Sequence, residues 1–350
     1  MPRHIVIGDI HGCFAELQAL LVAVEAQPDD VVVSVGDVVD RGPASVEVVN
    51  FLRARPNTIV VTGNHERKHI RGVLSYSQEI TRAQFGDAYA EAVQWMRTLP
   101  YCVELDDAVV VHAALLPGVP LAAQRDEVLC GSTAGEQELQ RALGHGRWHE
   151  SWDGPKPVIF GHHVVIEPLV RPRRIYGIDT GACHGGRLTA LTLPDFQLHS
   201  VPASADHWAH VRRSWQADVL AGKPWSEMTW AEIDEQLARL RSHGEPRTRA
   251  YLVALDAWRA ALDERRGEVL HVLLATAAGL AATASPEQAS AAMARHPLAG
   301  FLFQARRDRL DATTFARQCQ TPARLDEFSR GLGMAPLPVP SPPPRGGYAC

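Results

Sequence analysis

The chain has 350 residues, of which 46% are hydrophobic and 21% charged, proportions that are ordinary for a soluble globular protein. This length allows one large core or two domains. The net charge of -5 provides no basic surface for nucleic acid or an acidic membrane, so any attraction for a phosphate must be local. The six cysteines include no C-x-x-C pair, and we expect free thiols in a reducing compartment.

The chain shows no segment that we expect to direct it to a membrane. Residues 1–4 lead directly into the first apolar run, so we expect no signal peptide. The longest apolar stretch of the carboxyl-terminal half, residues 269–282, contains His271 and is too short to span a bilayer. We therefore expect a cytoplasmic protein without a membrane partner.

The central motif follows the apolar run at residues 31–35 and reads Gly36-Asp37-Val38-Val39-Asp40-Arg41-Gly42. The run predicts a buried strand, and the glycines let the backbone turn sharply at its carboxyl end. Asp37 and Asp40 are then like charges in one tight loop, which is costly unless a cation such as a divalent metal lies between them. Arg41 is left free to face an anion.

Two other apolar runs in the first 70 residues end in a similar way. Residues 4–7 lead to Asp9 and His11, which lie two apart on one side of an extended segment and can reach the same metal. Residues 58–61 lead into Gly-Asn-His-Glu, which offers an amide oxygen, an imidazole and a carboxylate.

Amphipathic segments separate these three runs. Residues 14–26 carry apolar side chains at helical spacing, and Pro43 has a favoured first-turn position for a second helix that ends before Pro56. Alternation of strands and helices implies parallel crossovers, and open α/β sheets bind ligands beyond the carboxyl ends of their strands. We therefore expect the three loops to converge.

Two later apolar runs end in histidines. Residues 109–111 lead to His112, and residues 158–161 lead to the adjacent His162 and His163. Histidines at strand ends, downstream of three acidic loops, are candidate metal ligands. The residues alone leave open which of the adjacent pair binds metal.

The motifs Gly-Asp-x-His-Gly, Gly-Asp-x-x-Asp-Arg-Gly and Gly-Asn-His-Glu, in this order, resemble those of the calcineurin-like metallophosphoesterase superfamily. The intact Asp40-Arg41-Gly42 is most similar to its phosphoprotein phosphatase branch. The resemblance implies an α/β fold, namely a β-sandwich of two mixed sheets flanked by helices.

Two later segments, residues 112–121 and 177–191, are similar to ApaH-like and bacterial phosphoprotein-phosphatase-like enzymes, and the likeness covers residues 4–203 in all. Relatives usually carry a glycine after the histidine of the first segment, where this chain has two alanines. In the second segment, we expect Asp179 and Arg187 to fix the final hairpin rather than to touch substrate.

The resemblance implies a site with two divalent metal ions, for which the ligand set is Asp9, His11, Asp37, Asn64, His112 and His162. Asp9 and His11 would hold one ion, Asn64 and the two later histidines the other, and Asp37 would bridge them. Mixed oxygen and nitrogen donors suit transition metals. We expect manganese first, with iron, zinc, nickel and cobalt as alternatives.

The resemblance also implies how these residues act. His65 would be the general acid for the leaving oxygen, and Asp40 would orient its imidazole. Arg41 would grip two phosphate oxygens, and Asn64 and Arg147 would also bind substrate. A metal-bridging hydroxide would attack phosphorus directly, so no cysteine or serine nucleophile is needed.

Three functions remain open on this basis. The first is a dinuclear-metal-dependent phosphatase that hydrolyses phosphate monoesters of the serine/threonine phosphoprotein type. The second is a hydrolase of phosphoanhydrides such as diadenosine tetraphosphate, polyphosphate or capped RNA. The third is a binding protein that retains the phosphatase fold with an idle site. The partner would be a phosphorylated protein, or a phosphorylated small molecule or nucleotide, and no oligomeric state is predicted.

The chain divides into three expected regions. Residues 1–205 form the catalytic domain, with a helical insertion at 67–100 that is either a lid or a surface helix pair. Residues 206–335 are helical, with helices at 230–240, 249–262, 269–282 and 286–294. Residues 336–350 contain six prolines and are expected to be a disordered tail or an extended linker.

Overall fold

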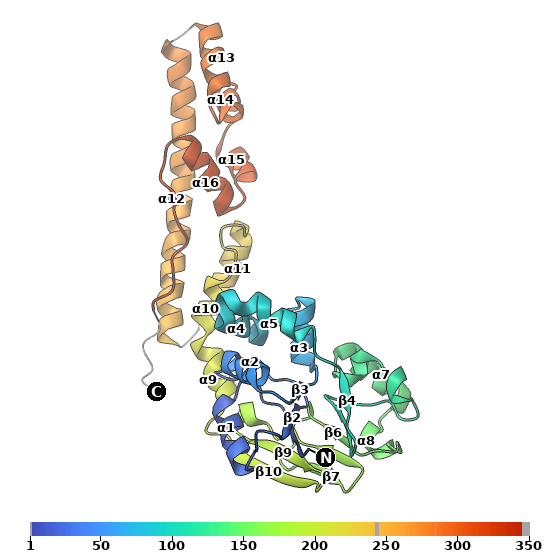
Figure 1. Ribbon diagram of the computed structural model, residues 1–350. Coiled ribbons are helices and arrows are strands. Elements are labelled where there is room, and N and C mark those ends of the chain that lie inside the picture. Colours follow the sequence, from blue (N-terminus) through green and yellow to red (C-terminus); the bar gives the residue numbers. More distant parts are fainter. Residues whose placement is uncertain (1, 242–244, 284, 345–350) are drawn as a thin grey trace. The chain divides into compact units, whose positions relative to one another are not determined.

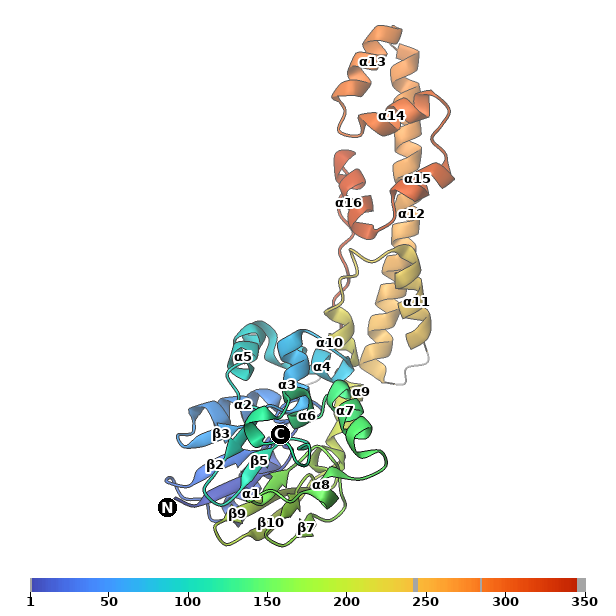
Figure 2. The same ribbon diagram turned by 90° about the vertical axis from the view of Figure 1, so that its right-hand side faces the viewer.

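The computed structural model describes residues 2–241, 245–283 and 285–344, which form two compact units (Figure 1 and Figure 2). The first unit comprises residues 1–219 and the second residues 220–350. The boundary lies beyond the expected position at 205/206, because α9 (His207–Ser214) is tied to the first unit. His207 Nε2 lies 2.8 Å from Glu16 Oε1 of α1.

The first sheet of the first unit has the strand order β10-β9-β1-β2-β3. Its strands are β1 His4–Ile7, β2 Val31–Ser34, β3 Thr58–Val60, β9 Arg187–Leu193 and β10 Gln197–Pro202. The strands β1, β2 and β3 run parallel, with His4 opposite Val31, whereas β9 is antiparallel to both β1 and β10. This confirms the three predicted parallel strands and the final hairpin.

The second sheet has the order β4-β5-β6-β8-β7, with β5, β6 and β8 parallel and both edge strands antiparallel. Its strands are β4 Cys102–Glu104, β5 Val109–Val111, β6 Val158–Phe160, β7 Leu169–Arg171 and β8 Ile175–Gly177. Side chains such as Val33, Val110 and Ile159 from both sheets form one buried cluster. The predicted sandwich of two mixed sheets is confirmed.

Helices cover the outer faces of both sheets. On the first sheet lie α1 (Phe14–Ala23), α2 (Ser45–Ala54), α3 (Asn64–Arg71), α4 (Tyr76–Phe85) and α5 (Tyr89–Met96). On the second lie α6 (Asp126–Leu129), α7 (Thr133–Leu143) and α8 (Trp148–Ser151). Short 3-10 turns occur at η1 (Gly86–Ala88), η2 (Leu121–Ala123) and η3 (Ala182–His184). The unit ends with α9 and the start of α10 (Gln216–Ala221).

The prediction for the second helix was wrong at its start. Pro43 precedes the N-cap residue Ala44, so it lies outside α2 rather than in its first turn. In the insertion, Met96 is fully buried, and Trp95 and Leu99 pack on the same cluster.

The second unit consists of helices arranged around α12 (Pro246–Thr283) (Figure 1). The others are α11 (Trp230–Leu240), α13 (Pro286–Arg295), α14 (Ala299–Arg306), α15 (Ala312–Gln318) and α16 (Pro322–Gly331). Figure 2 shows α11 beside α12. The predicted helix at 230–240 is confirmed, and so is the helix after Ser285-Pro286, where Ser285 caps α13.

The prediction of separate helices at 249–262 and 269–282 was wrong, because α12 runs through both without a break. The residues between these two stretches are mostly charged, but the buried stripe keeps its phase, because Leu262 and Val269 are both buried and lie seven positions apart. A seven-residue step is close to two helical turns, so both side chains lie on one face. No helix of the described residues is long and apolar enough to cross a membrane.

The described part of the proline-rich tail, residues 336–344, has neither helix nor strand and accepts hydrogen bonds from α12. Trp258 Nε1 donates to Leu337 O at 3.1 Å, and Arg247 Nε donates to Pro343 O at 2.7 Å. Proline lacks an N–H group, so the tail uses its carbonyl oxygens to accept bonds from side chains of the helix. Residues 345–350, with Cys350, lie outside the described residues, and the other five cysteines are free, as expected.

Candidate metal centre

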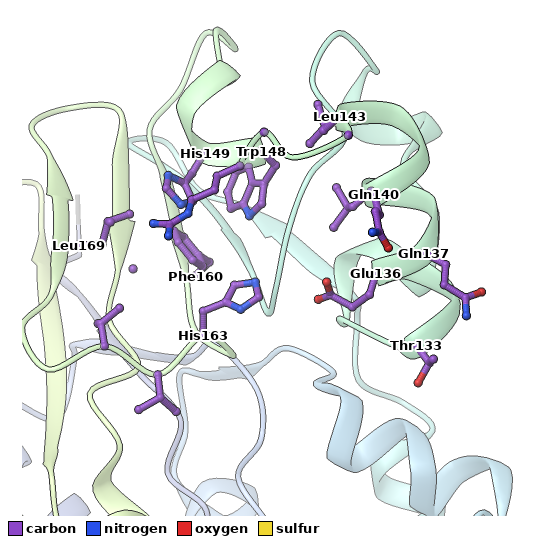
Figure 3. Close-up of a pocket in the computed structure, with 17 residues that line it drawn as sticks. Thr133, Glu136, Gln137, Gln140, Leu143, Trp148, His149, Phe160, His163 and Leu169 are labelled. Atoms are coloured by element: carbon purple, nitrogen blue, oxygen red, sulfur yellow. The ribbon is translucent and has the colours of Figure 1, made fainter.

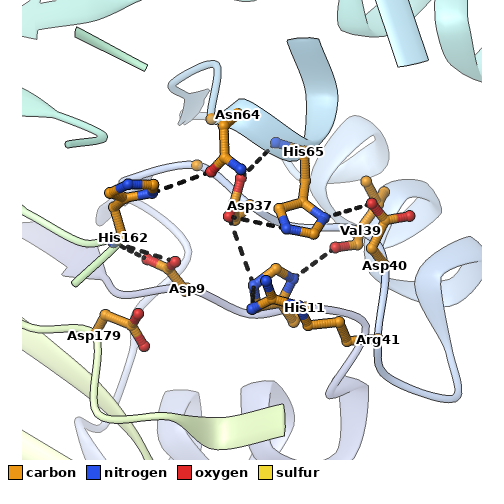
Figure 4. A network of polar contacts seen from close by, with 12 residues as sticks. Asp9, His11, Asp37, Val39, Asp40, Arg41, Asn64, His65, His162 and Asp179 are labelled. Atoms are coloured by element: carbon orange, nitrogen blue, oxygen red, sulfur yellow. Dashed lines mark hydrogen bonds and ion pairs between the residues drawn. The ribbon is translucent and has the colours of Figure 1, made fainter. Parts of the chain in front are cut away.

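The predicted ligands gather at the carboxyl ends of the strands (Figure 4). The members are Asp9 and His11 after β1, Asp37 after β2, Asn64 at the start of α3, His112 after β5 and His162 after β6. All of these side chains except Asn64 and His162 are almost fully buried. The expected convergence of the loops is therefore present.

One group of donor atoms surrounds Asn64. Its Oδ1 lies 3.1 Å from His112 Nε2 and 3.1 Å from His162 Nδ1. Asp37 Oδ2 lies 3.5 Å from His112 Nε2, and the ligand atoms of Asp37, His112 and His162 are all within 4.8 Å of one another. A carboxylate, an amide oxygen and two imidazoles form a donor set that suits a divalent transition metal.

A second group lies on the other side of Asp37. Asp37 Oδ2 is 3.6 Å from His11 Nε2 and 4.0 Å from His65 Nε2, and the donor atoms of these three residues lie within 4.8 Å of one another. Asp9 lies in neither group, and both of its carboxylate oxygens are 3.2 Å from the backbone nitrogen of His162. Asp37 thus belongs to both groups, which is the position expected of a bridging carboxylate.

The electrostatics of the cluster favour cations. Burial raises the pKa of Asp9 well above its usual value, and the neighbouring Asp179 raises it further. Burial would also raise the pKa of Asp37, but His112 and His65 beside it lower that pKa well below its usual value. Several buried carboxyl groups at such close range need positive partners. The residues present therefore fit two divalent metal ions.

The backbone around the candidate ligands adopts unusual conformations, which allow the carboxylates to pack closely. His11, Asp37 and His162 all have left-handed φ angles, of 46°, 49° and 65°. A Cβ atom on Gly161 would lie 1.9 Å from Asp9 Oδ1, and one on Gly63 would lie 2.1 Å from Asp37 Oδ1. Because side chains rarely adopt such angles, their concentration at one place indicates a functional site. The two glycines are required for the carboxylates to fit.

Asp40 lies next to the cluster and holds His65. His65 Nδ1 donates to Asp40 Oδ2 at 2.6 Å, which turns Nε2 toward Asp37. Asp40 Oδ1 also accepts from His69 Nε2 at 3.0 Å, and Gln78 donates to the same carboxylate. Burial would raise the pKa of Asp40, but His65 and His69 lower it. The contact expected between Asp40 and His65 is present.

The sequence motif leaves Arg41 free to face an anion. In the structure, Arg41 has a partner within the cluster. Its Nη1 lies 3.0 Å from His11 Nε2, while His11 Nδ1 lies 2.8 Å from Val39 O. The His11 ring therefore donates through Nδ1 and presents Nε2 as an acceptor. That atom is the one that would be available to a metal ion, and Arg41 contacts it in this structure.

The remaining predicted residues lie around this centre. Arg147 does not join the ligand cluster; it precedes α8, is exposed and lines a separate cavity. Asp179 Oδ1 accepts from Gly181 N at 3.0 Å, and Arg187 Nη2 donates to Ser200 O at 3.4 Å. These are contacts of loop-fixing residues, although Asp179 also lies beside Asp9 (Figure 4).

Sequence reasoning missed several residues that support the site. His69 follows His65 by four positions on α3, a spacing that places both on one helix face and could have indicated it. Gln78 and Glu136 gave no such signal. Glu136 Oε1 lies 3.3 Å from His162 Nε2, so this carboxylate can orient a ligand histidine through the ring nitrogen opposite Nδ1.

Comparison with known proteins identifies a family that the same region matches. Residues 2–172 match the family described as calcineurin-like phosphoesterase. The chain is 28% identical to the symmetrical bis(5'-nucleosyl)-tetraphosphatase of Erwinia tasmaniensis, over 57% of this chain and 96% of that protein. It is 29% identical to the asymmetrical bis(5'-nucleosyl)-tetraphosphatase PrpE of Bacillus subtilis, over 57% of this chain and 94% of that protein.

A metallophosphoesterase structure from Sphaerobacter thermophilus matches 70% of this chain and 95% of its own, at 20% identity and a TM-score of 0.39. The family match covers the five loops that carry the predicted ligands. Members of this family depend on two metal ions, which the donor groups around Asp37 could hold. The first unit therefore contains a calcineurin-like metallophosphoesterase domain, and this match indicates a hydrolase that acts on phosphoester or phosphoanhydride bonds.

Proposed function

We propose that the protein hydrolyses a phosphoanhydride bond of a dinucleoside polyphosphate such as diadenosine tetraphosphate. The observation that carries hydrolysis at phosphorus is the pair of donor groups that share Asp37. The phosphoanhydride is favoured by the relatives named as tetraphosphatases, which match over nearly their whole length. We propose a cytoplasmic location, for which the free cysteines give the support.

The metal ligands in this proposal are those predicted from the sequence, with manganese as the first ion to test. When bound, two divalent ions lower the pKa of a water molecule and neutralise phosphate charge. Asn64 belongs to one donor group and Arg41 contacts a member of the other, and both side chains can bind phosphate oxygens. A guanidinium group can donate to two such oxygens at once.

His65 supplies the proton for the leaving oxygen. Asp40 accepts the Nδ1 proton at 2.6 Å, so it fixes the orientation of the ring. The Nε2 proton then faces the cluster, because this atom lies 4.0 Å from Asp37 Oδ2. A general acid matters most when the leaving oxygen is strongly basic, as in an alkyl phosphate, and least for the phosphate of a nucleotide.

That dependence supports a second candidate, the hydrolysis of serine or threonine phosphate monoesters. The short Asp40–His65 contact positions a general acid, and poor leaving groups such as alkyl oxygens need general-acid catalysis. This candidate uses the same metals and the same Arg41. The two functions differ only in the group beyond the phosphorus atom.

The experiment is hydrolysis by metal-stripped protein reloaded with manganese, iron or zinc. The substrates are diadenosine tetraphosphate, a phosphoserine peptide, a phosphotyrosine peptide and p-nitrophenyl phosphate, compared by kcat/KM. The proposal predicts the largest value for the tetraphosphate. A preference for the phosphoserine peptide would establish the second candidate instead, and no turnover of any substrate by the metal-loaded protein would favour an idle site.

A further inference from the structure

A cavity of about 690 Å³ lies beside the metal centre. Figure 3 shows Trp148, His149, Phe160 and His163 on one side of it and Glu136, Gln137 and Gln140 of α7 on the other. This volume is in the range of sites for small organic ligands. All residues that line the cavity belong to the first unit.

The cavity begins one side chain away from a metal ligand. Glu136 lines it, and Glu136 Oε1 lies 3.3 Å from His162 Nε2. His163 lines it too, with a ring centroid 4.8 Å from that of His162. A substrate whose phosphate binds at the donor groups can therefore extend its remaining part into this space.

The wall of the cavity holds buried polar atoms without hydrogen-bond partners, two of them on aromatic side chains. Trp148 Nε1 and His149 Nδ1 have no hydrogen-bond partner among the described residues, although these side chains are only 4% and 9% exposed. An unsatisfied buried group of this kind costs about 1–3 kcal/mol, so it indicates a ligand that completes the bond. Burial lowers the pKa of His149, and Arg171 lowers it further, so the ring is neutral near pH 7 and can donate or accept.

Three aromatic side chains of the same wall pack on one another. The rings of Trp148 and Phe160 meet edge to face with centroids 5.0 Å apart, and those of His149 and Phe160 are within 19° of parallel. Because these rings are almost fully buried but line the cavity, a planar heteroaromatic group there would meet their edges, including the Trp148 N–H. Among the planar groups of nucleotides, a purine combines this shape with ring nitrogens that accept hydrogen bonds, which the donor Trp148 Nε1 requires.

Arg147 adds a charge to the same cavity. Its guanidinium group is exposed and has no hydrogen bond or ion pair with any part of the chain that the structure describes. A nucleotide carries its phosphate next to the sugar, so a cation on the lining of a base-binding cavity has a natural partner.

We propose that this cavity binds the purine nucleoside of the substrate, with the base on Trp148, His149 and Phe160 and a phosphate near Arg147. The inference rests on the proposed hydrolysis of a dinucleoside polyphosphate and names the residues that recognise its nucleoside. Arg147 then binds substrate, as the sequence predicts, but away from the metal ions.

The first test is direct binding, which needs no turnover. Calorimetry with manganese-loaded full-length protein compares adenosine 5'-monophosphate with ribose 5-phosphate, which lacks the base. We expect the nucleotide to bind at least ten times more tightly. Trp148→Phe keeps an aromatic ring but removes the N–H group, and it should reduce this preference about 3- to 10-fold, the effect of one neutral hydrogen bond.

Two further variants make the test specific. Trp152→Phe is the matched control, because the Trp152 indole already donates to Lys156 O at 3.3 Å and lines a different pocket. It should keep the preference for the nucleotide. Arg147→Gln, an exposed change that should not affect folding, is expected to weaken both phosphate ligands several-fold and to leave their ratio unaltered.

Failure of this inference can be separated from failure of the proposed function. Hydrolysis of the tetraphosphate without any preference for the nucleotide over ribose 5-phosphate would overturn the cavity assignment alone. A nucleotide preference that depends on Trp148, in a protein that does not cleave the tetraphosphate, would support the cavity and reject the reaction. Loss of phosphopeptide binding in Trp148→Phe, with nucleotide binding unchanged, would assign the cavity to a peptide.

Discussion

The two units bury different kinds of side chain. In the described residues of the first unit, carboxylates and histidines such as Asp37, Asp40 and His112 are almost fully buried. In those of the second unit, the buried polar side chains are the neutral Thr248 and Ser329. A buried charge is costly and is retained where chemistry needs it, whereas apolar packing only stabilises. Substitutions should therefore change chemistry in the first unit and stability in the second.

The largest effect expected is that of Asp37→Asn. The amide has the same shape but no charge to share between two ions, so we expect loss of bound metal and at least a thousandfold loss of turnover, about 4 kcal/mol. Metal content by mass spectrometry and kcat measure both losses. Asp30→Asn is the matched control, because Asp30 is equally buried but pairs with Arg3 at 2.7 Å, outside the cluster. Retention of both ions by Asp37→Asn would remove Asp37 from the role of bridge.

His65→Asn separates the acid from the ligands. We expect both ions to remain and turnover of poor leaving groups to fall by about 10²- to 10⁴-fold, the usual range for a general acid. A series of aryl and alkyl phosphates gives the measurement, since the loss should grow with the basicity of the leaving oxygen. His65 Nε2 lies with His11 and Asp37 in one donor group, so loss of metal would instead make His65 a ligand.

In the second unit, Phe328→Ala should lower stability without changing chemistry. Phe328 of α16 packs at 4.8 Å on Phe301 of α14 and at 5.8 Å on Phe315 of α15, measured between ring centroids. Truncating such a buried ring costs about 3–5 kcal/mol of the free energy of unfolding. Denaturant unfolding measures this cost, with the 68% exposed Val253→Ala as control. A change in metal content would contradict the separation of the two units.

The sequence predicted the cluster of candidate ligands better than its surroundings, for a physical reason. Each ligand follows an apolar strand and a sharp turn, and parallel strands end at the same edge of a sheet. Local patterns therefore placed Asp9, Asp37 and His112 together. Glu136 and Gln78 act through contacts with His162 and Asp40, which are distant in the sequence and belong to other elements. No local pattern reveals such pairs.

In the second unit, a local pattern led to a wrong prediction. The charged residues 263–268 were interpreted as the end of a helix, whereas the buried stripe of α12 continues past them. Arg266 lies in this segment with its guanidinium 5.5 Å from the ring centroid of Trp230 on α11. Long charged side chains can cover an apolar surface, so polarity alone does not end a helix. The regular spacing of the buried residues indicates the length of α12 better than the position of the charged residues does.

Not every buried charge of the first unit serves the metals, and Glu16→Gln tests one that does not. Glu16 Oε1 accepts from Ser204 N at 3.0 Å and lies 2.8 Å from His207 Nε2. Burial would raise the pKa of Glu16, but the hydrogen bonds from Ser204 and His207 lower it below its ordinary value of 4.5. The variant should lose about 1–3 kcal/mol of unfolding free energy at pH 7.

The pH dependence of that loss has a definite sign. A carboxyl group whose pKa is lower in the folded protein stabilises it above the unfolded-state pKa, and this contribution disappears as the pH falls through the folded-state value. The difference between wild type and Glu16→Gln should therefore shrink below about pH 4.5. Unfolding curves from pH 7 to pH 3 measure it, with the exposed Glu47→Gln as control. A difference that is constant with pH would show that the charge of Glu16 contributes nothing.

The smallest expected effect tests whether α12 is one continuous helix. Gly267 lies in the charged segment that was interpreted as a break, and a Cβ atom there would meet nothing within 4 Å. If the helix is continuous, Gly267→Ala should stabilise the second unit by about 1 kcal/mol, because glycine is the poorer helix former and the alanine methyl group fits without strain. Thermal unfolding followed by circular dichroism at 222 nm measures the gain. A hinge at this point would need the freedom of glycine, so a lower melting temperature for Gly267→Ala would mean that α12 bends where its sequence is most charged.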